Sequence, residues 1–283
     1  MLANMRTTLS LIMAELPEIS KIAKQMDSTF NGKKISALIV EQEKCINVST
    51  KEFNERIKNS EISGAYNKGK WLIIRMKNKE NILISVGMGG DILYYKDISK
   101  PLDKYQIRLE FSDKSGFTVK FWWFGKFMIC SDNELANEPS TKDIAMDPFN
   151  VNFTYEYFKN LLKGKKLQIK AFLMDQKNVS GIGNMYMHDI LFKAKLHPQR
   201  KISDMDESDI KTLYDSMISI LRSSESKGAF SYENDLFAQK GTFTTDDFLV
   251  GYKEGKPCPV CGTPIVQIKT GSTSSFVCTK CQK

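Results

Sequence analysis

Four cysteines near the C-terminus have the spacing of a metal site. Cys258 and Cys261 form one C-x2-C pair, and Cys278 and Cys281 form a second pair after sixteen intervening residues. Each pair offers two thiolates from one tight turn, which is typical of a zinc ribbon. Two disulfides are the alternative, but nothing else in the sequence indicates a secreted protein. Because four thiolates complete a tetrahedron, we expect one structural zinc ion with no open position for water.

Basic residues are concentrated in the C-terminal half of the chain. The 283 residues include 41 Lys plus Arg against 33 Asp plus Glu, which gives a net charge of +8. Residues 159–170 contain five Lys and no acid, and residues 251–283 contain five Lys and one Glu. A single run of this kind is often plain solvated surface. Two such runs in one half of the chain favour a face that binds phosphates.

Two short polar segments also have residue types suited to chemistry. The first is AELPE at 14–18, where Pro17 and two acids predict the start of a helix. On the residues alone, Glu15 is explained by its interaction with the helix macrodipole. The second is GIGN at 181–184, where Asn184 can cap a helix whose N-terminal amides bind phosphate. No predicted strand precedes this turn, so it is no dinucleotide fingerprint.

The elements that must position these residues change in type along the chain. The N-terminal half predicts a helix that ends at Gly32, then strands over 35–40, 71–76, 82–86, 105–111, 117–123 and 126–130. Many short strands of this kind predict a sandwich or a barrel. Cys45 and Cys130 are single cysteines in apolar segments with a strand-like pattern, so we expect both thiols to be buried.

After Asp147 the sequence pattern becomes typical of helices. Apolar residues recur at helical spacing over 155–162, 167–174, 185–193 and 210–221. Residues 224–247 are polar and contain glycine, which predicts an irregular, mobile loop before the ribbon. The sequence therefore predicts an α+β chain of several domains.

Taken together, the AELPE segment, the GIGN turn and the terminal ribbon resemble the formamidopyrimidine-DNA glycosylase and endonuclease VIII family of base-excision-repair enzymes. The resemblance runs from about Met13 to Lys283. It implies an N-terminal β-sandwich with a leading helix, here 14–145, and a helix–two-turn–helix domain, here 146–230. A loop and a zinc ribbon at 231–283 then complete the expected fold.

The resemblance also implies a mechanism. In this family the mature N-terminal amine attacks C1′ of the damaged nucleotide, the base leaves, and elimination from the Schiff base nicks the strand. Ala14 occupies the position of that amine, and Glu15 that of the acid which protonates the opening sugar ring. An α-amine has an ordinary pKa of about 7.7–8.0, so a useful fraction is neutral near pH 7.

Other positions match family residues that contact DNA. Lys70 matches a lysine that holds the phosphate at the lesion, although a strand-end lysine needs no such role. Met88 and Phe124 match side chains that fill the hole left by the everted base, and simple core packing is the alternative for Phe124. Asn184 matches a contact to a DNA phosphate.

The sequence departs from the family pattern at several positions. Ala14 stands where the family usually has Pro, so its amine is primary rather than secondary. Trp122 and Trp123 replace two arginines, one of which reads the base opposite the lesion, and stacking on indole is the expected substitute. Thr273 replaces a phosphate-binding arginine of the ribbon, and Ser85 replaces a histidine.

The first thirteen residues form a leader that the family pattern lacks. Their apolar patch is too short for a signal-peptide core, so we expect an unstructured leader or translation from Met13. In the second case, the small residue that follows permits removal of Met13 and frees the Ala14 amine. The chain has no run of about 18 apolar residues, so we expect no membrane span and a cytoplasmic, bacterial-type protein bound to the nucleoid.

We therefore expect a DNA glycosylase that acts on oxidised bases, with abasic-site lyase activity, working as a monomer on damaged double-stranded DNA. The alternative is a DNA-damage or abasic-site binding protein that has lost catalysis, which the missing Pro and Arg residues favour. A third possibility is a general zinc-ribbon nucleic-acid binder, which predicts no preference for damaged over intact duplex.

Overall fold

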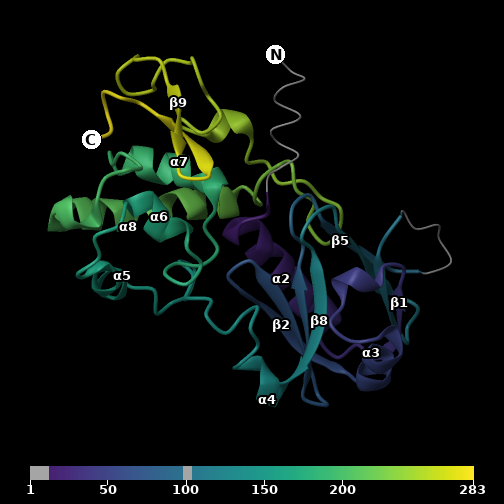
Figure 1. Cartoon of the computed structure of the whole chain (residues 1–283). Coiled ribbons are helices and arrows are strands. Elements are labelled where there is room, and N and C mark those ends of the chain that lie inside the picture. Colours follow the sequence, from purple (N-terminus) through teal and green to yellow (C-terminus); the bar gives the residue numbers. More distant parts are fainter. Residues whose placement is uncertain (1–12, 98–103) are drawn as a thin grey trace. The chain divides into compact units, whose positions relative to one another are not determined.

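The computed structural model describes residues 13–97 and 104–283, so the predicted leader lies outside the described residues except for Met13. The chain divides into two compact units. The first unit contains the residues up to Asp143 together with 228–242, and the second contains 144–227 and 243–283. Figure 1 shows the elements of both units along the chain.

Two four-stranded antiparallel sheets form the first unit. One sheet has the order β1-β6-β7-β5 (Ile35–Val40, Ile107–Phe111, Gly116–Lys120, Asp91–Tyr95). The other has the order β2-β3-β4-β8 (Ile62–Lys68, Trp71–Met76, Glu80–Ser85, Lys126–Ser131). The helices are α2 (Leu16–Phe30), α3 (Thr50–Ile57), α4 (Asp132–Leu135) and the 3-10 turn η1 (Glu43–Cys45). The predicted β-sandwich with a leading helix is confirmed.

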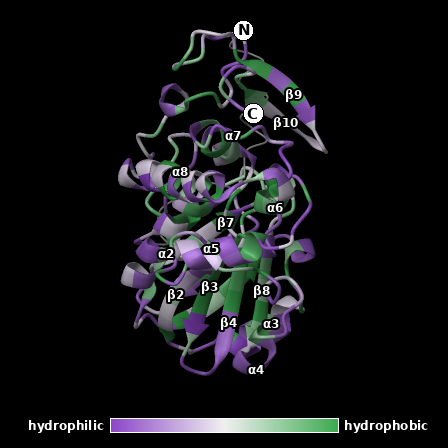
Figure 2. Ribbon diagram, turned by 90° about the vertical axis from the view of Figure 1, so that its left-hand side faces the viewer, coloured by the Kyte–Doolittle hydropathy of each residue, from purple (hydrophilic) through white to green (hydrophobic). Residues whose placement is uncertain are grey.

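Helix α2 and both sheets share one apolar core. The Phe30 ring, which is fully buried near the end of α2, lies 5.1 Å from the Phe117 ring and 5.3 Å from the Phe111 ring. Burying a side chain of this size stabilises the fold by roughly 1.5–3 kcal/mol. Figure 2 shows apolar residues, coloured green, along β3 and β8, as expected for strands that face a core.

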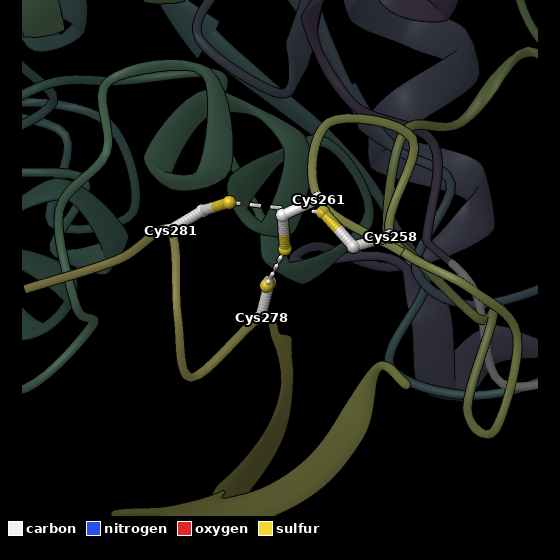
Figure 3. Close-up of side chains that lie close together, drawn as sticks. All are labelled: Cys258, Cys261, Cys278 and Cys281. Atoms are coloured by element: carbon white, nitrogen blue, oxygen red, sulfur yellow. Dashed lines mark hydrogen bonds between the residues drawn. The ribbon is translucent and has the colours of Figure 1, made fainter. Parts of the chain in front are cut away.

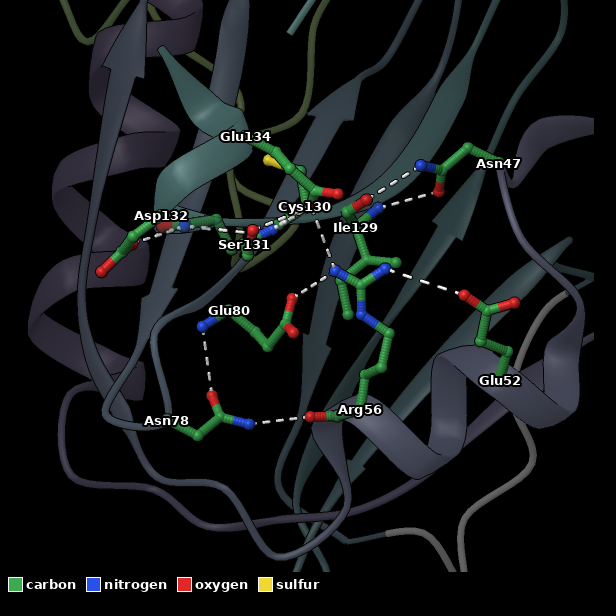
Figure 4. Close-up of polar contacts among 11 residues, drawn as sticks. Asn47, Glu52, Arg56, Asn78, Glu80, Ile129, Cys130, Ser131, Asp132 and Glu134 are labelled. Carbon is green, nitrogen blue, oxygen red and sulfur yellow. Dashed lines mark hydrogen bonds and ion pairs between the residues drawn. The ribbon is translucent and has the colours of Figure 1, made fainter. Parts of the chain in front are cut away.

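An ion-paired arginine fastens α3 to the edge of the second sheet. The Arg56 guanidinium lies 2.6 Å from a carboxylate oxygen of Glu80 on β4 and 3.6 Å from one of Glu134 on α4. Glu52, one turn earlier on α3, adds a third carboxylate at 3.8 Å (Figure 4). This network explains how a helix with only two buried residues, Phe53 and Ile57, is held in place.

The sequence prediction differs from the structure at several places in the first unit. Helix α3 and strands β2 and β5 were not predicted: α3 has only two buried residues, β2 contains Gly64, and β5 is a short strand of five residues with only Ile92 buried. The strand expected over 117–123 ends at Lys120, since the following residues turn sharply and Phe124 has a positive φ of 59°. The prediction of buried thiols at Cys45 and Cys130 is confirmed.

Four helices and a hairpin form the second unit. The helices are α5 (Tyr155–Leu162), α6 (Ile169–Met174), α7 (Asn184–Lys193) and α8 (Glu207–Ser226), with the 3-10 turns η2 (Ile202–Asp204) and η3 (Thr245–Asp247). Strands β9 (Val266–Thr270) and β10 (Thr273–Val277) form the C-terminal hairpin. The four helices predicted from periodicity are confirmed. The Asp189 carboxylate of α7 accepts the N–H groups of residues 249–251 and so ties the ribbon to the helices.

Residues 228–242, which we call the return segment, belong to the first unit. Their backbone is irregular, as predicted, but it is anchored at specific points. The Phe230 N–H donates to the Glu18 carboxylate at 3.0 Å, and the Leu236 N–H donates to the Gln25 side chain at 3.0 Å. The Tyr94 N–H of β5 donates to the Leu236 carbonyl at 2.8 Å. Periodicity could not predict these contacts, because the partners lie more than 100 residues apart.

Among the helices of the described residues, none combines the length and the apolar character that crossing a membrane requires.

Candidate active site

The residues that begin α2 lie buried beside two turns of the first unit. Ala14 is 5% exposed and Glu15 is 2% exposed. The backbone of Met13 forms an antiparallel bridge with Met88, and the Met88 N–H donates to the Trp123 carbonyl at 3.0 Å. The structure thus brings the predicted nucleophile position and acid next to the turns that carry the predicted hole-filling side chains.

Reciprocal hydrogen bonds hold the two acids at the start of α2. The Glu15 carboxylate accepts the Glu18 N–H, and the Glu18 carboxylate accepts the Glu15 N–H at 3.0 Å. The second oxygen of Glu18 accepts the Phe230 N–H of the return segment at 3.0 Å. Glu15 therefore has the capping role expected of a helix N-terminal acid, and it is also fixed next to Ala14. Sequence reasoning missed the role of Glu18, since its partner is 212 residues away.

The turn between β7 and β8 exposes three large aromatic side chains. Trp122 and Trp123 are each 60% exposed, and Phe124 is 78% exposed. Core packing of Phe124 is therefore wrong. Gly87 approaches this turn so closely that a Cβ would lie 2.0 Å from the Trp123 carbonyl oxygen, so only glycine fits there. Consecutive exposed aromatic rings of this kind are suited to stacking on a partner rather than to a core.

Lys70 lies at the same end of the second sheet as Met88. It is half-buried and directly precedes β3, where Leu72 pairs with Ile84 of β4. Continuing that antiparallel register places Lys70 level with Val86, two residues before Met88. The backbone of Lys70 therefore lies at the end of the sheet from which the Met88 turn begins.

A pocket of about 390 Å³ opens in the first unit beside these turns. One wall comes from the turns and strands, with Gly89, Asp91, Lys120 and Trp122, and the other from the return segment, with residues 231–234 and Lys240. Its volume falls in the range of roughly 300–1,000 Å³ that is usual for ligand pockets. No motif in the sequence predicted it.

Asn184 is placed differently from its predicted capping position. The N-cap of α7 is Gly183, and Asn184 is the first residue of the helix. The Asn184 Nδ2 atom lies 3.3 Å from Nε2 of His188, one turn later. Its Oδ1 atom is buried and accepts no hydrogen bond from any described residue. The prediction that Asn184 caps the helix is therefore wrong, while the N-terminal amides of α7 remain at the GIGN turn.

A lysine that the sequence did not single out is buried in the second unit. The Lys170 ammonium of α6 lies 2.8–3.0 Å from the hydroxyls of Thr270, Thr273 and Ser275 and from the Ser274 carbonyl, and its three N–H groups are shared among these four acceptors. Burial lowers the pKa of this ammonium to about 8. Thr273, which replaces a family arginine, thus receives a hydrogen bond from a cation of another element.

The four C-terminal cysteines converge as predicted. Their sulfur atoms all lie within 4.8 Å of one another, and none forms a disulfide (Figure 3). The Cys258 and Cys281 sulfurs are 3.8 Å apart, and the Cys261 and Cys278 sulfurs are 3.5 Å apart. Bonds of about 2.3 Å from one tetrahedral metal ion to four thiolates require sulfur separations of about 3.8 Å. The cluster therefore fits a metal ion bound by four thiolates.

Comparisons with known protein families match most of the chain. The formamidopyrimidine-DNA glycosylase N-terminal domain matches residues 13–122. The formamidopyrimidine-DNA glycosylase H2TH domain matches residues 144–234, and the zinc finger found in FPG and IleRS matches residues 255–283.

Whole-length relatives have the same name. A formamidopyrimidine-DNA glycosylase of Streptococcus pyogenes is 30% identical over 279 residues, which cover 96% of this chain and 99% of the relative. One from Bacillus cereus is 27% identical and covers 95% of this chain and 99% of the relative.

A solved structure has the same fold. The crystal structure of Lactococcus lactis Fpg in complex with DNA containing an abasic site superposes with a TM-score of 0.86. The two sequences are 24% identical, and the superposition covers 95% of this chain and 99% of the other.

Proposed function

The chain belongs to the formamidopyrimidine-DNA glycosylase family, and we propose that the amine of Ala14 is the nucleophile with which it acts on damaged DNA. It is a base-excision-repair DNA glycosylase that also cleaves abasic sites. The observation that carries the assignment of residues is the buried start of α2, which lies beside the Met88 and Trp122–Phe124 turns.

The proposed reaction begins at C1′ of the damaged nucleotide. The neutral Ala14 amine forms a bond to C1′, and the bond to the base breaks with its electron pair leaving on the base. Glu15 gives a proton to the ring oxygen as the bond from C1′ to that oxygen opens, and loss of the amine proton leaves a Schiff base. Removal of a C2′ proton then expels the 3′ phosphate and nicks the strand.

This assignment requires that Ala14 begin the mature chain. The family's N-terminal domain match starts at Met13, one residue before Ala14, which supports processing at that point. A peptide nitrogen has no available lone pair, so a chain that retains Met13 lacks this nucleophile. Intact-mass measurement of native protein identifies the first residue.

We propose that damaged double-stranded DNA binds across the exposed aromatic turn. Met88 and Phe124 fill the hole left by the everted base, and Trp122 stacks on the base that has lost its partner. Lys70 and Asn184 contact phosphates. The protein acts as a monomer at the nucleoid.

The metal of the four-cysteine cluster is proposed to be zinc. Cys258, Cys261, Cys278 and Cys281 hold it, and when bound it cross-links the ends of the ribbon. With four thiolate ligands it takes no part in the reaction, so its role is to shape the β9–β10 hairpin.

Borohydride trapping on a duplex that contains an abasic site tests the proposal. Protein that begins at Ala14 is expected to form a covalent adduct, and protein that retains residues 1–13 is expected to form none. Glu15→Gln is expected to lower excision of oxidised bases by at least 100-fold. Glu55→Gln, an acid exposed on α3, is the matched control and should match the parent.

Two results would contradict the assignment. An adduct formed by the chain that retains its leader would place the nucleophile on a lysine side chain. Specific binding of abasic DNA with no adduct at all would favour a binding protein that has lost catalysis.

A further inference from the structure

One carboxyl group in the return segment is buried without a role in the mechanism above. Glu233 is 9% exposed, and its Oε1 atom accepts no hydrogen bond from any described residue. A buried carboxyl oxygen without a hydrogen-bond partner destabilises the folded protein by about 1–3 kcal/mol. Such a group therefore calls for a functional explanation that offsets the lost stability. In an enzyme that binds an everted base, a ligand that completes the hydrogen bonds is one explanation.

The charges around Glu233 keep its carboxyl neutral. Burial, helped by the nearby Glu18 and Asp91 carboxylates and opposed by Lys240, raises its pKa to about 8. The charged or titratable groups that line the adjoining cavities are Glu18 and Lys21 of α2, Asp91 of β5, Lys120 of β7, and Asp235 and Lys240 of the return segment. A neutral carboxyl has one O–H donor beside one carbonyl acceptor, whereas a carboxylate only accepts.

Glu233 lies in the wall of the pocket beside the aromatic turn. It lines the pocket of about 390 Å³ together with the indole of Trp122 and the ring of Tyr232. Aromatic walls and a few polar groups are the usual means by which a pocket holds a base taken out of the stack. Glu18, which shares a small cavity with Glu233, is hydrogen-bonded to the residue that follows Ala14. Glu233 thus lines both the larger pocket and the small cavity that Glu18 shares, and Glu18 in turn holds the N–H next to the proposed nucleophile.

We propose that Glu233 is a specificity-determining residue whose carboxyl pairs with an adjacent N–H and C=O on the edge of an oxidised base. This inference rests on the proposed function. The O–H of Glu233 donates to the base carbonyl, and its carbonyl oxygen accepts the base N–H, so two parallel hydrogen bonds form. Oxidation of a purine at C8 creates such an edge at N7–H and C8=O, and thymine glycol, an oxidised pyrimidine, keeps the edge that thymine has at N3–H and C4=O.

The test compares two substrates in the Ala14-initiated chain loaded with zinc. One duplex contains 8-oxoguanine or thymine glycol, and the other contains an abasic site, which has no base to read. Glu233→Leu is expected to lower kcat/KM for the base-containing duplexes about 10- to 100-fold, because the base edge loses both partners. Adduct formation on the abasic duplex should stay within twofold of the parent. Glu55→Leu is the control for a substitution elsewhere in the unit.

The pH dependence of excision distinguishes a Glu233 side chain that hydrogen-bonds to the base from one that only supports the fold. Excision by the parent should fall as the pH rises above 8, where Glu233 loses the proton that it donates. Glu233→Gln keeps one donor and one acceptor and cannot titrate, so it should retain activity and lose that decline. A duplex with 8-oxoguanine methylated at N7 should be excised equally poorly by the parent and by Glu233→Leu.

Two outcomes would overturn the proposal while leaving the proposed function intact. Either Glu233→Leu excises both bases as the parent does, or it loses abasic adduct formation by the same factor as base excision. Failure of the parent itself to form the abasic adduct would instead overturn the proposed function, and this inference with it.

Discussion

The buried ammonium of Lys170 gives the sharpest stability prediction. It is 5% exposed, and its three N–H groups are shared among four neutral oxygens of the β9–β10 hairpin, with no carboxylate among its partners. Burial lowers its pKa from 10.5 to about 8. At pH values below 8 the lysine is charged in both states, so the folded state bears the cost of burying the charge. Between pH 8 and 10.5 only the unfolded chain binds the proton, and the free energy of unfolding therefore rises with pH.

The size of this rise follows from the two pKa values. Each unit of difference corresponds to about 1.4 kcal/mol, so the full shift is worth about 3 kcal/mol. Between pH 7.5 and 9.5 the linkage amounts to at most about 1.8 kcal/mol, and screening by nearby solvent leaves at least about 1 kcal/mol of it. For a unit of this size, that change corresponds to roughly 3–8 °C in unfolding temperature.

Thermal unfolding of the zinc-loaded chain at pH 7.5, 8.5 and 9.5 measures this effect. The stability of the parent should rise relative to Lys170→Met by the amount above, and Lys170→Gln should behave as Lys170→Met does. Lys166→Met, an exposed lysine in the same unit, should follow the pH profile of the parent. Parallel profiles for the parent and Lys170→Met would refute the account of a buried cation without an anionic partner.

Three further predictions concern the metal, the aromatic turn and a buried thiol. Chelation of zinc should lower the unfolding temperature of the second unit by more than 5 °C in calorimetry, because metal binding contributes to folding; an unchanged transition would show that the cluster binds no structural metal. The parent should excise an oxidised base opposite all four bases with less than tenfold variation, while Trp122→Arg should introduce a preference, since a bidentate arginine contact contributes about 1–3 kcal/mol. A strong preference in the parent would contradict stacking by indole. Burial and the nearby Glu138 and Glu134 carboxylates raise the pKa of Cys130 to about 12, so iodoacetamide at pH 8 should not modify it in the folded protein, as mass spectrometry would show.

The fold could be predicted where buried apolar residues recur at a regular spacing along one helix or strand. Strands such as Trp71–Met76 and helices such as Tyr155–Leu162 have apolar residues at the period of their own geometry, and these predictions are confirmed. Strand Ile62–Lys68 and helix Thr50–Ile57 were not predicted. The strand is stabilised mainly by pairing with β3 and the helix mainly by the ion pairs of Arg56, rather than by their own apolar residues. A local sequence pattern cannot reveal an interaction with a residue that lies far away in the chain.

The same distinction separates the parts of the candidate site. The four cysteines were predictable because all four ligands come from two short knuckles whose spacing is visible in the sequence. The roles of Glu233 and Lys170 were not predictable. A glutamate in a loop and a lysine in a basic run usually lie exposed on the surface, so their sequence context gives no sign of burial. Their roles arise from burial among residues from distant parts of the chain, such as Asp91 beside Glu233 and Thr273 beside Lys170.

The two oxygens of Glu18 explain how the first unit keeps its attacking residue and its pocket wall together. One oxygen accepts the N–H that follows Ala14, and the other accepts the N–H of Phe230 in the return segment. If either segment moved by more than a hydrogen-bond length, a buried N–H would lose its partner at a cost of about 1–3 kcal/mol. Since residues 231–234 line the pocket, the wall that we propose contacts the base and the residue that we propose attacks its sugar are held by one carboxylate. Under the proposed mechanism, a base that displaces this wall would also disturb the position of the Ala14 amine, so that the Glu18 carboxylate would couple recognition of the lesion to the chemistry.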